Sequence, residues 1–203
     1  MSVSQKYPVT NCAAIILAAG QSSRLGTPKQ LLKYQGKSLL QHTINVAKHS
    51  SVQSIIVVLG SDFELMVKEI DSPDISIVKN ENWHTGLASS IYCGINALKD
   101  IDPVSDAAIL MVCDQPFISS ELLDNLVAEQ KATGKPIVAS KYEDTIGIPA
   151  LFHQSFFTQL QELEGDSGAK KIMQQHPDII AVVPFPSGNI DIDTLGDYEA
   201  LTK

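Results

Sequence analysis

The sequence predicts an α/β fold: a single-domain, doubly wound, mainly parallel sheet with a small antiparallel edge. Two observations carry this prediction. Short runs of small and aliphatic residues, such as 12–19 and 54–59, are apolar throughout, which is typical of strands buried on both faces of a parallel sheet. Segments of about ten residues with apolar positions at helical spacing separate these runs, as in repeated strand–helix–strand units.

Composition agrees with one soluble globular domain. The chain has 203 residues, of which 44% are hydrophobic and 19% charged, enough for one substantial core. We expect residues 1–11 to form an N-terminal extension and residues 12–203 the domain. The net charge of −8 argues against a nucleic-acid partner. Residues 1–11 do not read as a secretory signal and no apolar run is long enough to cross a membrane, so we expect a cytoplasmic protein.

The first half of the chain predicts four strands and three helices. Ser38 and Asp62 precede two apolar-periodic segments and are expected as helix caps, whereas Gly86 leads into the third helix. The expected strands are 12–19, 54–59, 75–79 and 107–112, and the expected helices are 39–49, 63–70 and 87–98.

The second half predicts one helix and four strands. Ser119 or Ser120 is the expected cap of helix 119–131. The expected strands are 136–140, 148–152, 179–183 and 190–192, of which one or more would run antiparallel as an edge. Cys12, Cys93 and Cys113 lack metal-site spacing and are expected as buried free thiols.

The segment 15–29 is the expected phosphate-binding loop. It begins in the first buried strand and turns polar at Gly20, where small residues, short hydroxyl side chains and two cations follow. Its spacing fits neither a P-loop, because five residues separate Gly20 from Gly26, nor a dinucleotide fingerprint, which needs a third glycine. Loops at the carboxyl end of a first strand commonly hold nucleotide phosphates.

Three further polar clusters follow. Gly86 precedes a helix whose first amides, with Ser89 nearby, suit an anion or a base edge, although a plain capped helix start explains them equally well. Asp114 follows the strand 107–112 and is a candidate metal ligand, the alternative being an ordinary turn aspartate. Asp191 and Asp193 alternate on an expected strand and would face the same side.

The pattern Leu-Ala-Ala-Gly-x-Ser-x-Arg-Leu-Gly-x-Pro-Lys at 17–29 resembles the signature of nucleotidyltransferases. Gly-Leu-Ala-Ser-Ser at 86–90, Asp-Gln-Pro at 114–116 and Asp-Ile-Asp-Thr at 191–194 are similar to later motifs of the MocA-type molybdenum cofactor cytidylyltransferases, within the MobA-like superfamily. The chain departs from them at Leu87, in place of Met, and at Leu195, in place of Pro. The resemblance implies a Rossmann-like, glycosyltransferase-A-like fold.

The resemblance also implies roles for individual residues. Catalytic roles fall to Arg24, Lys29 and Asp114, and a shared Mg²⁺ ion would be held by Asp114 and Asp193, with Asp191 in reserve. Two segments similar to acceptor-binding motifs of the family contribute Gly147, Pro149, Asp166 and Gly168. The expected nucleotide-binding residues are Leu17, Ala18, Ala19, Gly20, Gln21, Ser22, Ser23, Arg24, Lys29, Gly86 and Ser89.

The reaction implied by the resemblance is transfer of a nucleoside monophosphate from an NTP to a phosphorylated pterin cofactor, with release of pyrophosphate. Ala19 indicates CTP, because family members with Gly at this position accommodate guanine. CTP and molybdopterin are therefore the leading substrates, and a transient contact with a molybdoenzyme or its chaperone is a further implied partner. Alternatives are an NAD(P)H-dependent oxidoreductase, which the missing dinucleotide fingerprint disfavours, and a nucleotide-binding regulatory protein without turnover.

Overall fold

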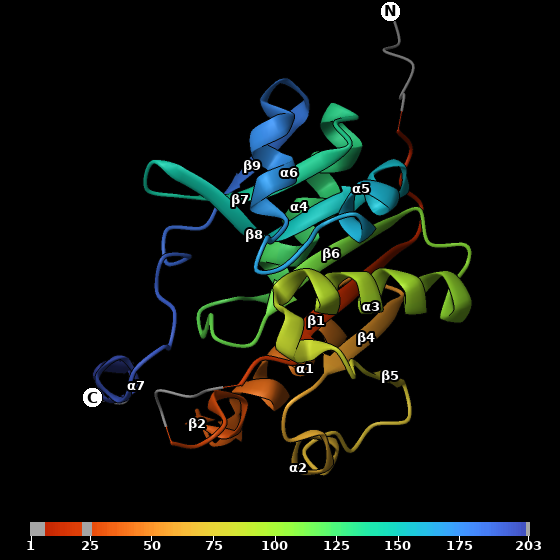
Figure 1. The fold of residues 1–203 in the computed structure, drawn as a ribbon. Helices are drawn as coiled ribbons and strands as arrows, with labels where there is room; N and C mark the ends of the chain where they lie inside the picture. The colour runs from red at the N-terminus through yellow and green to blue at the C-terminus, as the bar shows by residue number, and fades with distance from the viewer. Residues whose placement is uncertain (1–6, 22–25, 202–203) are drawn as a thin grey trace, which may run out of the picture.

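The computed structural model describes residues 7–21 and 26–201, which form a central seven-stranded sheet with helices on both faces (Figure 1). The strand order is β5-β4-β1-β6-β8-β7-β9. The strands are β1 (Cys12–Ala18), β4 (Ser54–Leu59), β5 (Ile75–Lys79), β6 (Ala107–Val112), β7 (Ile137–Tyr142), β8 (Thr145–His153) and β9 (Ile180–Pro184).

Strand directions confirm the predicted doubly wound, mainly parallel fold. β1 pairs in parallel with β4 on one side and β6 on the other, and β9 is parallel to β7. Among the described strands of this sheet β8 alone runs the opposite way, and it lies inside the sheet, between β6 and β7. The small antiparallel part is a separate hairpin of β2 (Lys33–Tyr34) and β3 (Lys37–Ser38).

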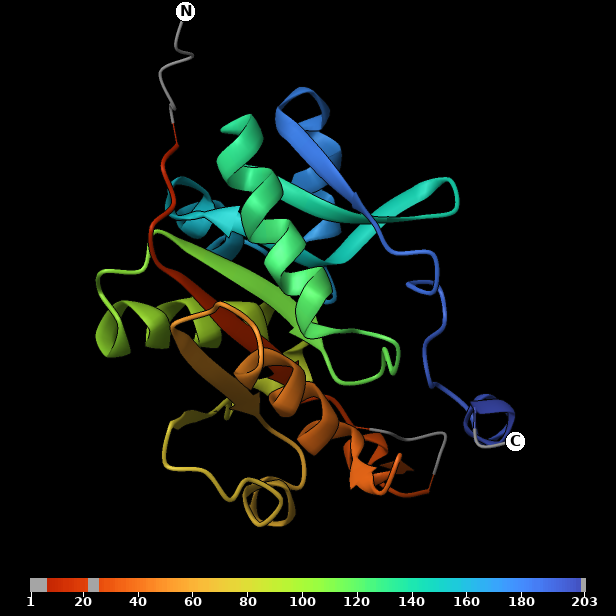
Figure 2. The same cartoon turned by 180° about the vertical axis from the view of Figure 1, so that it is seen from behind.

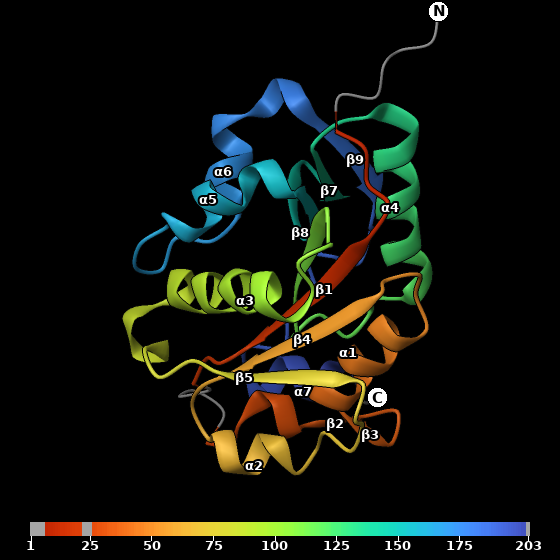
Figure 3. The same cartoon turned by 90° about the vertical axis from the view of Figure 1, so that its right-hand side faces the viewer.

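The helices form two layers, one on each face of the sheet (Figures 2 and 3). α3, α5 and α6 cover one face, and α1 and α4 cover the other (Figure 3). The helices are α1 (Leu39–Lys48), α2 (Phe63–Val67), α3 (Leu87–Ile101), α4 (Ser120–Thr133), α5 (Phe157–Gln161), α6 (Lys170–Gln175) and α7 (Leu195–Leu201), with 3-10 turns η1 (Lys29–Leu31), η2 (Trp83–Thr85), η3 (Gln154–Phe156) and η4 (Pro177–Ile179). None of the helices in the described part of the chain is long and apolar enough to cross a membrane.

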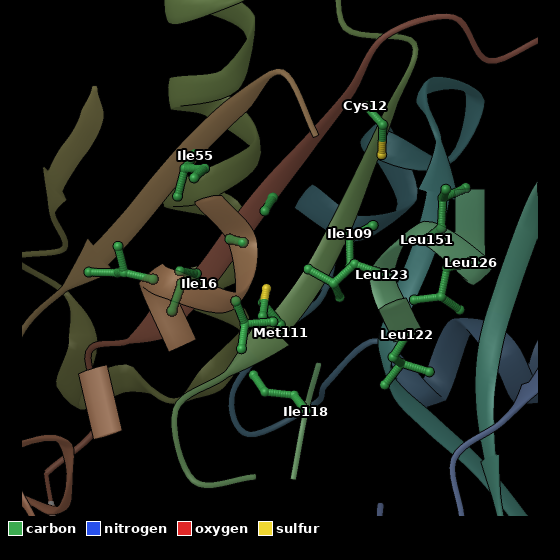
Figure 4. Close-up of a cluster of buried hydrophobic side chains, with 14 of the residues drawn as sticks. Cys12, Ile16, Ile55, Ile109, Met111, Ile118, Leu122, Leu123, Leu126 and Leu151 are labelled. Atoms are coloured by element: carbon green, nitrogen blue, oxygen red, sulfur yellow. The ribbon is translucent and has the colours of Figure 1, made fainter. Parts of the chain in front are cut away.

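β1 explains why its sequence is apolar without interruption. Its residues alternate between the two faces of the sheet, so that Ala14 and Ile16 belong to one buried cluster and Ala13 and Ile15 to the other. Figure 4 shows Ile16 in the first cluster, among side chains from β6 and α4. A strand with helices on both faces exposes no side for polar residues, and the run 12–18 is buried at every position.

Several expected elements are confirmed and two features are wrong. Strands 54–59, 75–79 and 107–112 have the predicted bounds, and Ser38 caps α1 in a capping box with Gln41. Asp62 does not cap α2, because its backbone is left-handed at φ 56° and its side chain makes no cap hydrogen bond. No strand forms at 190–192, where the chain has no sheet neighbour.

The cysteines are free, as predicted, but they differ in burial. Cys12 and Cys113 are buried, and desolvation raises the pKa of each thiol to about 12. Cys93 is only half-buried, because it lies on the side of α3 that lines a surface groove. Its thiol donates to the carbonyl of Lys79 at 3.8 Å. The expectation of a fully buried Cys93 is therefore wrong.

Candidate functional site: two carboxylates around a lysine at the sheet edge

The sheet order places the loops after β1 and β6 next to one another. The chain runs from β1 outward through β4 to β5 and then returns to form β6 on the other side of β1. This reversal opens a crevice at the carboxyl ends of the two central strands, which is the usual ligand site of doubly wound sheets. The loop after β1 brings Lys29 to this edge, and the loop after β6 brings Asp114.

Lys29 lies between the two carboxylates that the sequence assigns to metal. Its Nζ is 2.5 Å from Asp114 Oδ2 and 3.1 Å from Asp193 Oδ1. These contacts join residues 85 and 164 positions apart in the sequence. The Lys29 and Asp114 side chains are 23% and 18% exposed, whereas that of Asp193 is 56% exposed. The structure therefore brings three predicted site residues together at one point.

The segment 185–194, which we call the C-terminal strap, carries Asp193 to this point. Ile192 is buried, and its N–H donates to the carbonyl of Asp114 at 2.9 Å. The side chain of Gln115 donates to the carbonyl of Gly188 at 3.1 Å, which ties the strap to the β6–α4 loop a second time. Asp193 owes its place to these bonds and not to the strand pairing predicted for it.

The charges at the site change the ionisation of its members. Burial alone would lower the pKa of Lys29, but the charges and hydrogen bonds of Asp114 and Asp193 raise it above its ordinary value. The pKa of Asp191 is raised to about 6, first by burial and then by repulsion from Asp114 and Asp193. Lys29 is therefore positively charged, and the carboxylates of Asp114, Asp191 and Asp193 repel one another.

The donor set fits a hard divalent cation. Asp114 Oδ1 is buried and makes no hydrogen bond within the described residues, so this oxygen has an unused lone pair at the site. Carboxylate oxygens are the ligands that Mg²⁺ and Mn²⁺ prefer. No group of three or more His, Cys, Asp or Glu side chains in the described part of the chain is arranged for a metal. Two carboxylates would therefore need phosphate and water to complete the coordination.

Gln30 shapes the loop after β1. This side chain is 3% exposed, and its Nε2 donates to the carbonyls of Ala18 and Gly20 at 3.0 and 2.9 Å. The two bonds hold both ends of the turn where the predicted phosphate loop begins. Ser22, Ser23 and Arg24, which the sequence assigns to nucleotide binding, lie outside the described residues.

A cavity of about 280 Å³ opens beside this loop and the start of α3. Five predicted nucleotide-binding residues line it, and five residues without that assignment complete its wall. The predicted ones are Leu17, Ala19, Gly20, Gln21 and Gly86, and the others are Trp83, His84, Leu87, Ser90 and Asp166. Ser89 lines a separate groove of about 730 Å³ on another side of α3, so the serine that reaches the cavity is Ser90.

Gly86 is needed where the wall of this cavity is formed. Its φ is 113°, and an added Cβ would lie 2.4 Å from the backbone of Gly165. The carbonyl of Gly165 in turn accepts a hydrogen bond from the N–H of Ala88 at 3.0 Å. This close packing brings Asp166, predicted for acceptor binding, into the same cavity as the predicted nucleotide residues.

The other predicted acceptor residues have different surroundings. Gly147 lies in β8, where an added Cβ would meet the hydroxyl of Tyr142, and the carbonyl of Pro149 accepts from the hydroxyl of Ser140 at 2.6 Å. Gly168 lies close to the side chain of Leu87. None of the three lines the 280 Å³ cavity.

The predicted site residues leave out Gln30, Trp83 and Ser90, although Ser90 stands in the quoted motif at 86–90. Ser90 could have been found from the motif, because Ser90 and not Ser89 is the fifth residue of the family pattern that begins at Gly86. Trp83 follows β5 just as Gly20 follows β1, and both lie at the carboxyl edge of the sheet. No pattern in the sequence indicates that Gln30 bonds backwards to the end of β1.

Comparison with known sequences gives three informative relatives. The chain is 41% identical over 120 residues to bifunctional protein GlmU of Alkaliphilus oremlandii, covering 57% of this chain and 24% of that protein. It is 31% identical over 122 residues to a probable molybdenum cofactor guanylyltransferase of Bacillus mycoides, covering 60% and 58%. It is 23% identical to nicotine blue oxidoreductase of Paenarthrobacter nicotinovorans over 193 residues, covering 89% and 91%. The chain thus spans about a quarter and somewhat over half of the first two relatives.

Solved structures agree with the fold. The homologue of Mycobacterium tuberculosis Rv0371c from Mycobacterium sp. strain JC1 superposes with a TM-score of 0.82 at 31% identity, covering 94% of each chain. Rv0371c of M. tuberculosis H37Rv in complex with manganese gives a TM-score of 0.75 at 27% identity, covering 95% of this chain and 98% of that one. The model of the MobA-like NTP transferase domain matches residues 14–179. By this match over most of its length, the chain belongs to the MobA-like NTP transferase domain family.

Proposed function

We propose that this protein is a divalent-metal-dependent nucleotidyltransferase that transfers CMP from CTP to a phosphorylated pterin cofactor such as molybdopterin and releases pyrophosphate. One observation carries the proposal: Lys29, Asp114 and Asp193 converge at the carboxyl edge of β1 and β6, next to a cavity lined by the loop after β1. A cation and two carboxylates in this place suit the handling of a triphosphate with its metal.

The chemistry asks for positioning and charge neutralisation. An oxygen of the acceptor phosphate attacks the α-phosphorus, the new P–O bond forms, and the bond to pyrophosphate breaks with the electron pair on the leaving group. A phosphate monoester is already ionised near neutral pH, so no general base is needed. Lys29 would bind the triphosphate and stabilise the departing pyrophosphate, and Asp114 and Asp193 would hold Mg²⁺ or Mn²⁺, whose charge offsets the repulsion between the two anionic reactants.

The nucleotide base is assigned to the 280 Å³ cavity. The methyl group of Ala19 narrows its wall, which favours a pyrimidine over a purine. The Bacillus relative is named a guanylyltransferase, so the base preference needs a direct test. We expect kcat/KM for CTP to exceed that for GTP by about ten- to 200-fold, the range for a difference of one small group.

The acceptor is proposed to approach from the side of Asp166 and the C-terminal strap. Asp166 lines the cavity at its α6 side, and the strap ends at the carboxylate pair. The relatives include both a molybdenum cofactor transferase and GlmU, so sugar phosphates belong among the acceptors to be compared. The proposed delivery partner is a molybdoenzyme or its chaperone.

The decisive experiment measures pyrophosphate release with each of four NTPs against a panel of pterin phosphates and sugar phosphates, with Mg²⁺ and with Mn²⁺. We expect release with CTP and a pterin phosphate, and its loss in Asp114→Asn. Asp71→Asn, which changes an exposed carboxylate away from this site, is the matched control and should keep full release. Turnover with no pair of substrates, or turnover that survives Asp114→Asn, would contradict the proposal.

A second candidate comes from the relative named nicotine blue oxidoreductase, which this chain matches over 89% of its length. The loop after β1 lacks the glycine spacing of a dinucleotide fingerprint, which counts against this activity. Oxidation of NADH or NADPH, followed by absorbance in the presence of quinone-like dyes, separates the two. Cofactor oxidation without pyrophosphate release would replace the transferase proposal.

A further inference from the structure

Asn80 is a buried polar residue that the proposed chemistry does not use. It follows the last residue of β5 and is 4% exposed. Its backbone N–H donates to the carbonyl of Leu59 at 2.7 Å, so the ladder between β5 and β4 fixes its position. Asn80 lines the separate 730 Å³ groove, and its side chain contacts Ser89 and Ser90 in the first turn of α3. Ser90, in turn, lines the 280 Å³ cavity.

The hydrogen bonds of Asn80 settle which way its side-chain amide faces. Its Oδ1 accepts from the backbone N–H of Asn82 at 2.9 Å. A backbone N–H can only donate, so the atom at that end of the amide must be the oxygen. The Nδ2 group therefore faces the other way, where it lies 2.9 Å from Ser89 Oγ and 3.1 Å from Ser90 Oγ.

Both serine hydroxyls consequently act as acceptors toward Asn80, and each has its own proton left to donate. Ser89 gives its proton to the carbonyl of Gly86 at 2.8 Å. The Ser90 hydroxyl makes no other hydrogen bond with the described residues, and Ser90 lines the cavity. Its proton is therefore available to a group inside the cavity, and a bound acceptor atom would satisfy it.

We propose that Asn80 is a positioning residue for the nucleotide base: it presents the Ser90 hydroxyl as a hydrogen-bond donor to an acceptor atom on the base edge, such as a pyrimidine carbonyl oxygen. The inference rests on the proposed function, because it needs the base to occupy this cavity. Asn80 itself touches no substrate. It acts through Ser90: because the Nδ2 group of Asn80 can only donate, the Ser90 hydroxyl finds no acceptor there, and its proton stays available to the base.

Asn80→Asp is the sharpest test, because the two side chains have the same shape. The carboxylate would replace the two Nδ2 donors with an acceptor, and the Ser90 proton would turn toward it and away from the cavity. We expect the Kd of a non-hydrolysable CTP analogue with Mn²⁺ to rise about tenfold, as for the loss of one buried hydrogen bond. The Kd of tripolyphosphate with Mn²⁺, which has no base, should stay within about twofold. Both are measured by isothermal titration calorimetry.

Asn96→Asp is the matched control, because it makes the same change of charge on an exposed residue of α3 that lines the separate groove. It should leave both dissociation constants unchanged. Ser90→Ala should weaken CTP binding as much as Asn80→Asp does, and the double variant should be no weaker than Ser90→Ala alone, since both changes remove one and the same bond.

Three outcomes would overturn the inference. CTP binding could be unchanged in Asn80→Asp, tripolyphosphate binding could weaken by the same factor, or the effects of Asn80→Asp and Ser90→Ala could add fully. Urea unfolding of each variant shows that the fold is kept. Failure of the proposed function itself has a different signature, because the wild-type protein would then bind neither the CTP analogue nor tripolyphosphate.

Discussion

The positive charge of Lys29 offsets the repulsion between the carboxylates of Asp114 and Asp193. Without Lys29, repulsion between Asp114 and Asp193 would be unopposed at short range, and the partly buried Asp114 would lose its partner at 2.5 Å. Removing one of the two carboxylates is therefore not expected to stabilise the protein. Lys29 already offsets the repulsion between the two carboxylates in this structure, and loss of Asp114 would leave its ammonium group paired only with the more exposed Asp193 among these residues.

Lys29→Met is expected to reduce pyrophosphate release at limiting CTP by roughly ten- to a hundredfold, because a charge-assisted contact to phosphate is worth about 1.5–3 kcal/mol. Initial rates at several CTP concentrations measure this effect. Lys33→Met removes a lysine that is 59% exposed and pairs loosely with Glu69 at 3.7 Å, so it serves as the matched control with a full rate. Equal rates in the two variants would remove Lys29 from the phosphate site.

His153 predicts a pH dependence of stability. The residue is 8% exposed, and burial lowers the pKa of its imidazole below 6.5, with the nearby charge of Asp106 acting in the opposite direction. Below about pH 6.5 the unfolded chain therefore binds more protons at this position than the folded chain, and the free energy of unfolding falls as the pH falls through that value.

Urea unfolding at about pH 7.5 and about pH 5.5 measures this loss, which should be smaller in His153→Gln because glutamine does not titrate. Asp106 does not confound the comparison. Burial opposes ionisation of its carboxyl, but the hydrogen bonds from Thr10 and Asn11 outweigh burial and lower its pKa below 3.8, so its contribution is lost only at more acidic pH. An identical pH difference in wild type and His153→Gln would show that another group carries it.

The same residues show how far sequence reasoning reached. Lys29 and Asp114 follow strands in recognisable motifs, and topology then brings them together. Asn80 gives no such signal, since its importance comes from the direction of its amide, which depends on the backbone N–H of Asn82. Motif spacing predicts which loops meet at the sheet edge, whereas the hydrogen-bond polarity of the site emerges only from the folded geometry.

Among the secondary-structure elements, strands buried on both faces could be predicted from the sequence, whereas irregular segments could not. β1, β4 and β6 are almost entirely apolar runs between clear turn signals. The segment 190–192 alternates in the same way as a half-buried strand, yet only Ile192 is buried and no neighbouring strand pairs with it. Local alternation cannot show whether a partner strand is available.

The packing of α3 on the sheet depends on the small size of Gly94. An added Cβ at Gly94 would lie 2.5 Å from Ile15 Cγ2 and 3.2 Å from Val58 Cγ2. Gly94→Ala gains about 1 kcal/mol of helix propensity but overpacks the interface at a cost of about 1–3 kcal/mol. We expect a net loss of up to about 2 kcal/mol in the free energy of unfolding by urea.

Gly196→Ala provides the comparison within α7. A Cβ there meets only Thr194 Oγ1, at 3.6 Å, so the gain in propensity is not opposed. This variant should be as stable as the wild type or more stable by up to about 1 kcal/mol. Stabilisation of both variants to the same degree would mean that α3 can move away from β1 without loss.

The C-terminal strap connects the two halves of the site at the scale of the whole molecule. It leaves β9 beyond one end of the sheet and runs past the carboxyl edge to α7, which lies near the hairpin of β2 (Figure 1). The strap has no helix or strand of its own, and its described bonds to the rest of the chain include those with Lys29, Asp114, Gln115, Lys141 and Glu143. Such a segment can open locally while the sheet stays folded.

The strap therefore predicts that metal binding and global stability respond differently to one buried side chain. Ile192→Ala removes the apolar anchor next to Asp193, and the strap should open more often. We expect the affinity for Mn²⁺ in the presence of a CTP analogue to fall about tenfold or more, because Asp193 is lost as a charged partner. The free energy of unfolding should fall by less than the about 2–5 kcal/mol that such a truncation costs in a cooperative core.

Ile190→Ala tests the same strap without touching its anchor, since Ile190 is 44% exposed. It should leave both quantities near their wild-type values. Paramagnetic resonance of free Mn²⁺ gives the affinity, and urea unfolding gives the stability. Suppose instead that Ile192→Ala lowered the free energy of unfolding by the full amount of a core truncation and kept its Mn²⁺ affinity. The strap would then belong to the cooperative core, and the position of Asp193 would not depend on Ile192. The two outcomes differ because a strap that opens locally moves the Asp193 carboxylate while the sheet behind it stays folded.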